Sequence, residues 1–105
     1  MINREENPNF LNSFLDYNIT ILNKSSNTVK EYNYDIVNFL KFIKCGKKTG
    51  DFKEAIISNI TIKELKEIKL EDIHSYIAYM ATYLNSKPTT RARKVASIKT
   101  FFTYL

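Results

Sequence analysis

Basic side chains cluster in residues 86–105, a stretch that contains no acid. Five of the chain's 16 Lys and Arg residues lie there, whereas all 11 Asp and Glu residues lie in residues 1–85, which are therefore neutral. Thr89, Arg93 and Ser97 are spaced by four and would share one side of a helix. Lys and Arg side chains neutralise phosphates, and hydroxyl groups hydrogen-bond to phosphate oxygens. These residue types predict a surface that contacts the phosphates of a nucleic acid.

The same stretch has the pattern of an amphipathic helix. Pro88 suits the first helical position, because it has a fixed φ and no N–H to lose, and Lys87 would then be the cap. We therefore expect a helix over residues 88–105. Its buried stripe is predicted from apolar residues at helical spacing, namely Val95, Ile98, Phe102 and Leu105, with Phe101 beside them.

Composition restricts the class of protein. A chain of 105 residues with 44% hydrophobic residues, seven Phe and seven Tyr can bury a single core. Two Gly and two Pro are too few for a turn-rich β-sandwich. The net charge of +5 favours an anionic partner. We expect one domain.

The cellular compartment is predicted from what the sequence lacks. Cys45 is the single cysteine, so it has no partner for an internal disulfide, which fits a reducing cytoplasm. Residues 1–15 do not have the pattern of a signal peptide, and no apolar run approaches the length of a membrane span. We expect a cytoplasmic protein with no membrane partner.

The sequence offers little for catalysis. His74 is the single histidine and lies off the apolar stripe of its predicted helix. Cys45 and His74 together cannot supply the four ligands of a zinc site, and the two glycines match no phosphate-binding loop. We therefore predict no catalytic residues, no metal and no cofactor, and interpret the sequence as a binding surface.

Helical periodicity and capping residues predict an all-α fold, a compact bundle of four long helices and one short one. Residues 1–7 are expected to be a flexible N-terminus, with Asn7 capping the first helix. Gly46 is expected to end the second helix, and residues 46–60 to form a connector whose part at 55–57 is either strand-like or helical. Thr61 and Glu64 form a capping-box pattern. The predicted helices cover residues 8–23, 27–45, 62–68, 70–85 and 88–105.

The expected core follows from the apolar spacing within each helix. The second helix has the widest apolar band and is predicted to be central. Outside the last helix, the side chains predicted to be buried are Phe10 or Leu11, Phe14, Tyr17, Ile21, Leu22, Val29, Tyr32, Ile36, Phe39, Leu40, Ile43, Ile62, Leu65, Ile68, Ile73, Tyr76, Ile77, Met80 and Leu84.

Four segments, in this order and at this spacing, resemble a known family. They are residues 26–32 (SNTVKEY), 39–42 (FLKF), 70–77 (LEDIHSYI) and 90–105 (TRARKVASIKTFFTYL). Together they resemble the N-terminal, SAM-like core-binding domain of tyrosine recombinases of the phage-integrase, Xer and Cre type. The resemblance covers residues 8–105. Arg91 departs from the family pattern, which usually has an apolar residue there.

The resemblance implies a helical domain that binds one face of duplex DNA, at a recombination core site, opposite a separate catalytic domain. The family's catalytic residues lie in that second domain. The chain is therefore expected to be an excised or truncated part of a recombinase that cannot cleave DNA by itself. In the full-length protein it would act with other recombinase protomers during integration or excision, whereas the isolated domain is expected to be a monomer.

The resemblance also assigns the DNA contacts, because the second and last helices of the family approach the major groove. Arg93 is the expected reader of a base edge, since its fork matches guanine, and the lysines are expected to contact phosphates. On this basis Arg93→Ala would relax sequence preference, whereas Lys94→Ala would weaken all duplexes alike. The predicted DNA-binding residues are Lys24, Ser25, Asn27, Thr28, Lys30, Glu31, Tyr34, Lys87, Thr89, Thr90, Arg91, Arg93, Lys94 and Ser97.

Two alternatives remain open from the sequence. The basic helix could belong to a helical protein-interaction module that binds an acidic partner. A regulator of the helix-turn-helix type is the other alternative, since residues 85–87 make a short connection, although both flanking helices are long for that motif.

Overall fold

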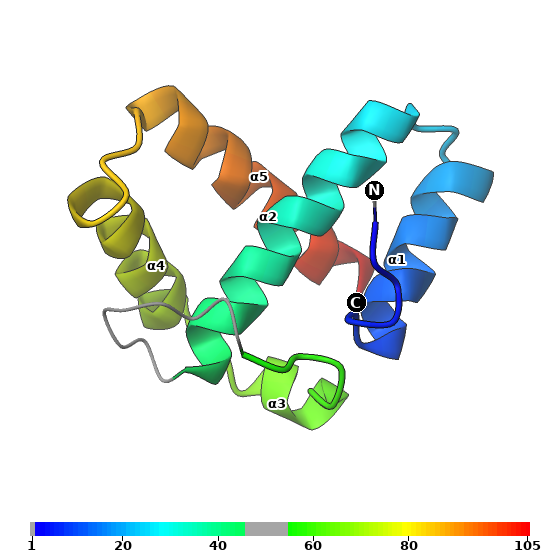
Figure 1. Cartoon of the computed structure of the whole chain (residues 1–105), viewed down its shortest axis with the longest axis horizontal. Coiled ribbons are helices and arrows are strands. Elements are labelled where there is room, and N and C mark those ends of the chain that lie inside the picture. Colours follow the sequence, from blue (N-terminus) through cyan, green and yellow to red (C-terminus); the bar gives the residue numbers. More distant parts are fainter. Residues whose placement is uncertain (1, 46–54) are drawn as a thin grey trace.

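The computed structural model describes residues 2–45 and 55–105, and every regular element in these residues is an α-helix. The predicted all-α bundle of four long helices and one short helix is confirmed (Figure 1). The predicted stop at Gly46 and the first part of the connector lie outside the described residues. The helices are α1 (Asn9–Thr20), α2 (Ser26–Lys44), α3 (Ile62–Lys66), α4 (Leu70–Thr82) and α5 (Pro88–Tyr104).

Helix α2 is central, as predicted, and packs against α1, α4 and α5 (Figure 1). The Ser25 hydroxyl caps its start and accepts a hydrogen bond from the Thr28 N–H at 3.2 Å. Lys41 and Lys44 lie in its last turn, where positive charge complements the helix dipole. Local capping and charge therefore fix the ends of α2, and its apolar sides gather the other helices.

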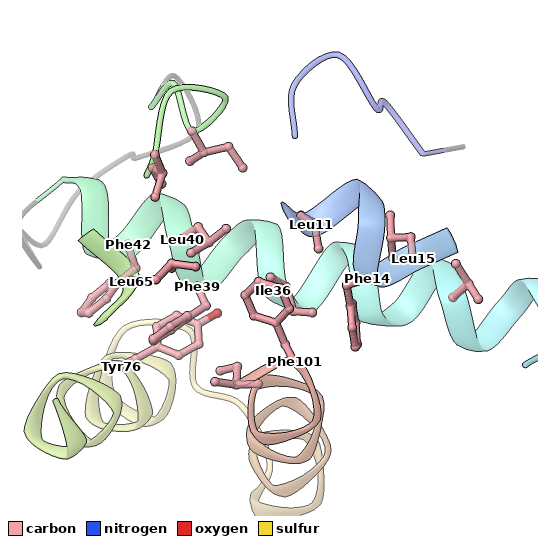
Figure 2. Packing of buried hydrophobic residues seen from close by; sticks show 14 of the residues in the cluster. Leu11, Phe14, Leu15, Ile36, Phe39, Leu40, Phe42, Leu65, Tyr76 and Phe101 are labelled. Carbon is pink, nitrogen blue, oxygen red and sulfur yellow. The ribbon is translucent and has the colours of Figure 1, made fainter. Parts of the chain in front are cut away.

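The core forms where aromatic side chains of α1, α4 and α5 meet α2 (Figure 2). Phe101 of α5 contacts Phe14 of α1 edge-on, with 5.3 Å between ring centroids. Phe39 of α2 meets Tyr76 of α4 at the same centroid distance. Full burial of one such side chain stabilises the fold by about 1.5–3 kcal/mol, so these contacts hold α5 and α4 against the bundle.

Helix α1 is shorter than predicted at both ends. Pro8 is its cap residue, not its first helical residue, and the Asn7 side chain is buried between Asn12 and Asn33, with its amide donating to both side-chain oxygens. The helix ends at Thr20, and Asn23 then adopts a positive φ of 53°. The predicted burial of Ile21 and Leu22 is wrong, because the chain has left the helix and both are exposed.

The segment 55–57 is neither strand nor helix, but Ile57 is buried in the core. The capping box at the start of α3 is confirmed, since Thr61 and Glu64 exchange side-chain and backbone hydrogen bonds. Leu65 is buried as predicted, whereas Ile62 is exposed in the first turn. Helix α3 thus covers the core with one leucine.

Helix α4 ends at Thr82, three residues before the predicted end. Asn85 then takes a positive φ of 49°, which turns the chain toward α5. Leu84 lies in this connection and is exposed, so its predicted burial is wrong. At the other end of α4, the Asp72 carboxylate accepts the Lys69 backbone N–H at 2.8 Å.

Helix α5 begins at Pro88, as predicted, and the predicted burial of Ile98 and Phe101 is confirmed, but the inward side is shifted relative to the rest of the predicted stripe. Ser97, Ile98 and Phe101 are the buried residues of this helix. Leu105 is 47% exposed, so its predicted burial is wrong. The inward face is therefore rotated by about one residue toward Ser97, which brings a polar side chain into the interior.

Candidate nucleic-acid interface

A fully buried carboxylate joins the two helices that carry the predicted DNA contacts. Asp35 of α2 has a side chain that is 0% exposed, and it receives three donors from α5. Arg93 Nη1 lies 2.7 Å from Oδ2, the Ser97 hydroxyl donates to Oδ2 at 2.8 Å, and Lys94 Nζ lies 3.1 Å from Oδ1. Both oxygens of the carboxylate are therefore engaged by α5.

Burial of Asp35 explains the rotation of α5. An isolated buried carboxylate is costly, and it is tolerated in a protein interior when it is paired and hydrogen-bonded. Arg93, Lys94 and Ser97 lie at i, i+1 and i+4, so one face of α5 presents all three to Asp35. The polar contacts thus lie beside the apolar contacts of Phe101 and set the angle of α5 about its own axis.

Arg93 lies at the edge of this contact and reaches solvent. Its side chain is 42% exposed, and its Nη1 also lies 3.9 Å from Glu31 Oε2 on α2. In the described part of the chain, neither Nε nor Nη2 has a hydrogen-bond partner. One edge of the guanidinium is held by acids of α2 while the other edge remains available for a ligand.

Lys94 is held more tightly than Arg93. Its side chain is 12% exposed, and its ammonium lies 4.8 Å above the centre of the Tyr34 ring in addition to the Asp35 contact. A carboxylate and an aromatic face both stabilise a cation. The charge of Lys94 is therefore compensated within the protein, and Tyr34, which is exposed, covers it.

The connection before α5 is fixed by polar contacts. The Ser86 hydroxyl donates to the Met80 carbonyl at 3.0 Å, and Arg91 Nη1 donates back to the Ser86 carbonyl. Arg91 thus links the first turn of α5 to the connection that precedes it. The apolar residue that the family pattern usually has at this position could not make this hydrogen bond. Thr89 is exposed beside it and Thr90 is half-buried.

The start of α2 presents polar groups beside its cap. The Ser25 hydroxyl donates to Thr28 Oγ1 at 2.9 Å, which fixes both side chains at the first turn. Lys24, Asn27 and Lys30 are exposed around them. This end of α2 therefore offers hydroxyl, amide and ammonium groups on a rigid first turn.

The N-terminal ends of α2 and α5 both lie at the top of the view, at its right and its left, and the helices converge from them toward their contact (Figure 1). The contacts of Arg93 with Glu31 and Asp35 join the two edges. Thr28, Thr90, Arg91 and Lys94 are half-buried. The exposed predicted residues are Lys24, Ser25, Asn27, Lys30, Glu31, Tyr34, Lys87, Thr89 and Arg93.

Ser97 does not belong to the exposed strip that the spacing predicted. It is 3% exposed, and its hydroxyl is used by Asp35. The i, i+4, i+8 spacing correctly placed Ser97 near Arg93 on the helix, but the buried acid on α2 turns that line inward at its last position. Ser97 is therefore a packing residue of this surface.

Asp35 is the residue of this contact that the sequence pattern did not identify in advance. A signal was present, since Asp35 follows Tyr32 by three residues and precedes Phe39 by four, which places it on the apolar face of α2. A carboxylate at such a position indicates a buried and paired acid. The basic residues of the last helix were the available partners.

Uncompensated positive charge surrounds the contact. Lys24, Lys30 and Lys87 make no ion pair with any residue that the structure describes. Of the five bases in residues 86–105, two are used by Asp35 and Arg91 contacts a carbonyl. The surface thus combines a compensated centre with free lysines at both helix starts.

The described residues give little support for a metal site, a reactive tyrosine or a membrane-spanning helix. Residues 2–45 and 55–105 contain no group of three or more potential metal ligands, and His74 is exposed. Burial raises the pKa of the Tyr76 phenol, which therefore keeps its proton and packs against Phe39 and Phe42. None of the described helices has the length and apolar character that crossing a membrane requires.

Comparison with known proteins relates this chain to recombinase domains. Residues 10–105 match the family described as phage integrase, N-terminal SAM-like domain. The chain is 37% identical over 102 residues to a protein named tyrosine recombinase XerC from Caldanaerobacter subterraneus subsp. tengcongensis, an alignment that covers 93% of this chain and 29% of that protein. No solved structure matches the chain significantly.

Two further relatives, each named tyrosine recombinase, come from Pseudothermotoga lettingae and Agathobacter rectalis. Each is 30% identical to the chain over 95 residues, which is 90% of this chain. The alignments cover 28% and 25% of those two proteins. The chain therefore spans less than a third of the length of these curated relatives.

Proposed function

Because this chain belongs to the family of phage integrase N-terminal SAM-like domains, the core-binding domains of tyrosine recombinases, we propose that it binds duplex DNA at a recombination core site. The observation that carries this proposal is the joining of the polar starts of α2 and α5 through Arg93, Glu31 and Asp35. Two helix starts on one side of a rigid domain can contact neighbouring parts of one duplex.

The contacts divide by chemistry into phosphate binding and base reading. Lys24, Lys30 and Lys87 are exposed and uncompensated within the described residues, which suits neutralisation of phosphates. Ser25, Asn27, Thr28, Thr89 and Thr90 supply short polar groups near the same helix starts, which suit phosphate oxygens. Arg93 has a fixed guanidinium with an open edge, which suits the O6 and N7 atoms of guanine.

Salt-dependent duplex binding tests this proposal. The 105-residue chain should bind duplex DNA with an affinity that falls linearly on a log–log plot against salt concentration. Phosphate contacts by Lys24, Lys30 and Lys87 would together give a slope of about −2.7, since each phosphate contact contributes about −0.9. A slope near zero would contradict DNA binding through this surface and would favour the alternative of a protein-interaction module with an acidic partner.

The strand-cleaving residues are inferred to lie in the part of the relatives that this chain does not cover. The support is the alignment, which accounts for 29% of the XerC-named relative. On this proposal the full-length recombinase assembles with other protomers on DNA, whereas the 105-residue chain is a monomer that binds without cleaving. Sedimentation of the chain with and without duplex checks the monomer, and incubation with supercoiled plasmid checks the lack of cleavage.

A further inference from the structure

We propose that Asp35 is a positioning residue that gives Arg93 its base preference, an inference that rests on the proposed DNA binding. Asp35 is fully buried and cannot touch DNA itself. Its Oδ2 lies 2.7 Å from Arg93 Nη1, and the Ser97 hydroxyl donates to the same oxygen at 2.8 Å. The hydrogen bond from Ser97 therefore fixes the orientation of the carboxylate that holds the Arg93 guanidinium.

The geometry leaves the base-reading edge of Arg93 open. A guanidinium has five N–H donors in one plane, and Nη1 is the nitrogen that Asp35 uses. Nε and Nη2 lie on the other edge and have no hydrogen-bond partner within the described residues. Two parallel donors on that edge match the two acceptors of guanine in the major groove. Holding Nη1 removes rotamers of the long side chain that would point elsewhere, so less conformational entropy is lost when DNA binds.

Asp35 also lowers the net positive charge of the proposed DNA-binding surface. It compensates both Arg93 and Lys94, with Nζ of Lys94 at 3.1 Å from Oδ1. Two cations that are already paired attract the phosphates of an arbitrary duplex less than two free cations do. Asp35 is thus expected to lower affinity for unrelated DNA while raising preference for a guanine at one position. A residue with only a structural role would not have these two opposite effects.

The test uses the 105-residue chain and a randomised pool of duplex DNA, from which the preferred duplex is selected. Affinities are then measured for that duplex, for its single-base-pair variants and for an unrelated duplex. Arg93→Ala should reduce the preference for one G·C pair by about 5- to 150-fold, the range that a bidentate contact provides. Asp35→Asn should reduce the same preference at least about 5-fold and leave affinity for the unrelated duplex equal or higher. In the Arg93→Ala background, Asp35→Asn should change the preference no further.

Asp16→Asn is the matched control, because Asp16 lies on α1 in an exposed ion pair with Arg4, so the change removes the same charge and should leave the preference unchanged. If Asp35→Asn does not fold, the order of side-chain Nε–H groups in the free wild-type chain gives the test by NMR. Arg93, 42% exposed, should be more ordered than Arg4, which is 40% exposed.

In the Asp35→Asn variant, either an unchanged base preference or an equal loss of affinity for every duplex would overturn the positioning role. Arg93 as mobile as Arg4, or a wild-type chain with salt-dependent binding but no base preference, would also overturn it while leaving the proposed function intact. A wild-type chain that does not bind duplex DNA at all would remove both proposals.

Discussion

The Ser97 hydroxyl donates a 2.8 Å hydrogen bond to the Asp35 carboxylate, across the contact between α5 and α2 and over a sequence separation of 62 residues. Both residues are buried. This pair fixes which side of α5 faces inward, and it places Arg93, one turn earlier on α5, at the rim of the contact. The orientation of the proposed DNA-binding side chain is therefore set from inside the bundle.

Removing the Ser97 hydroxyl should destabilise the domain. Ser97→Ala leaves a buried carboxylate with one donor fewer, and we expect the free energy of unfolding to fall by about 1–3 kcal/mol. Urea denaturation followed by circular dichroism measures this change. Ser75→Ala is the matched control, because within the described residues the exposed Ser75 hydroxyl bonds only the Glu71 carbonyl, and its effect should stay within about 0.5 kcal/mol. Equal losses in the two variants would contradict the role of Ser97.

The inward face of α5 can be tested by truncating two apolar residues. Phe101 is fully buried against Phe14 and Phe10, so Phe101→Ala should lower the free energy of unfolding by about 3–5 kcal/mol. Leu105 is exposed, and Leu105→Ala should cost no more than about 0.5 kcal/mol. Thermal melts of the two variants compare them directly. A larger loss at Leu105 would restore the stripe predicted from spacing alone.

Stability should fall in strongly alkaline solution because of Tyr76. Burial, assisted by the charge of Asp35, raises the pKa of the folded-state phenol above its ordinary value of 10.0. Below pH 10.0 the Tyr76 phenol keeps its proton in both the folded and the unfolded chain, so its contribution to the free energy of unfolding is fully present there. Above that pH the unfolded chain ionises and the folded one does not, so the free energy of unfolding falls by up to about 1.4 kcal/mol per pH unit.

Denaturant titrations at a series of alkaline pH values measure that slope. Tyr76→Phe should make it shallower by the contribution of one proton. Tyr83→Phe, which changes an exposed tyrosine of the same stacked series, is the matched control. The explanation fails if Tyr76→Phe and the wild type lose stability in parallel.

Lys87 should contribute to affinity for all duplexes alike. It is exposed at the start of α5 and has no ion pair within the described residues, so it can neutralise one phosphate. Lys87→Ala should reduce the magnitude of the slope of log affinity against log salt by about 0.9 and leave base preference unchanged. Lys66→Ala, on α3 away from both helix starts, should leave the slope as it is (Figure 1). Equal changes in slope for the two variants would argue against a localised surface.

Charge compensation changes the expectation for Lys94. From the sequence, Lys94→Ala was expected to weaken all duplexes alike, as a phosphate-binding lysine would. In the structure its ammonium is engaged by Asp35 and covered by Tyr34. We therefore expect Lys94→Ala to lower the free energy of unfolding, while its effect on the salt slope should be smaller than that of Lys87→Ala.

Local signals in the sequence were sufficient for most helix starts. Pro88 and the Thr61–Glu64 capping box act within a few residues of the chain, so their effect does not depend on the rest of the fold. Helix ends were harder to predict. Asn23 and Asn85 end α1 and α4 by adopting positive φ, and an asparagine tolerates this conformation without requiring it.

The amino-acid sequence by itself determined the helical class, the central helix, the concentration of positive charge near α5 and the resemblance that indicated the family, because periodicity, charge and motif order are properties of the chain alone. The tertiary structure decided which side of α5 faces inward and which cations remain free. That choice depends on Asp35, whose burial is paid for by Arg93, Lys94 and Ser97 about 60 residues away. Helical spacing within α5 cannot report a partner on another helix, so the exposed edge of Arg93 became visible only once α2 and α5 were packed together.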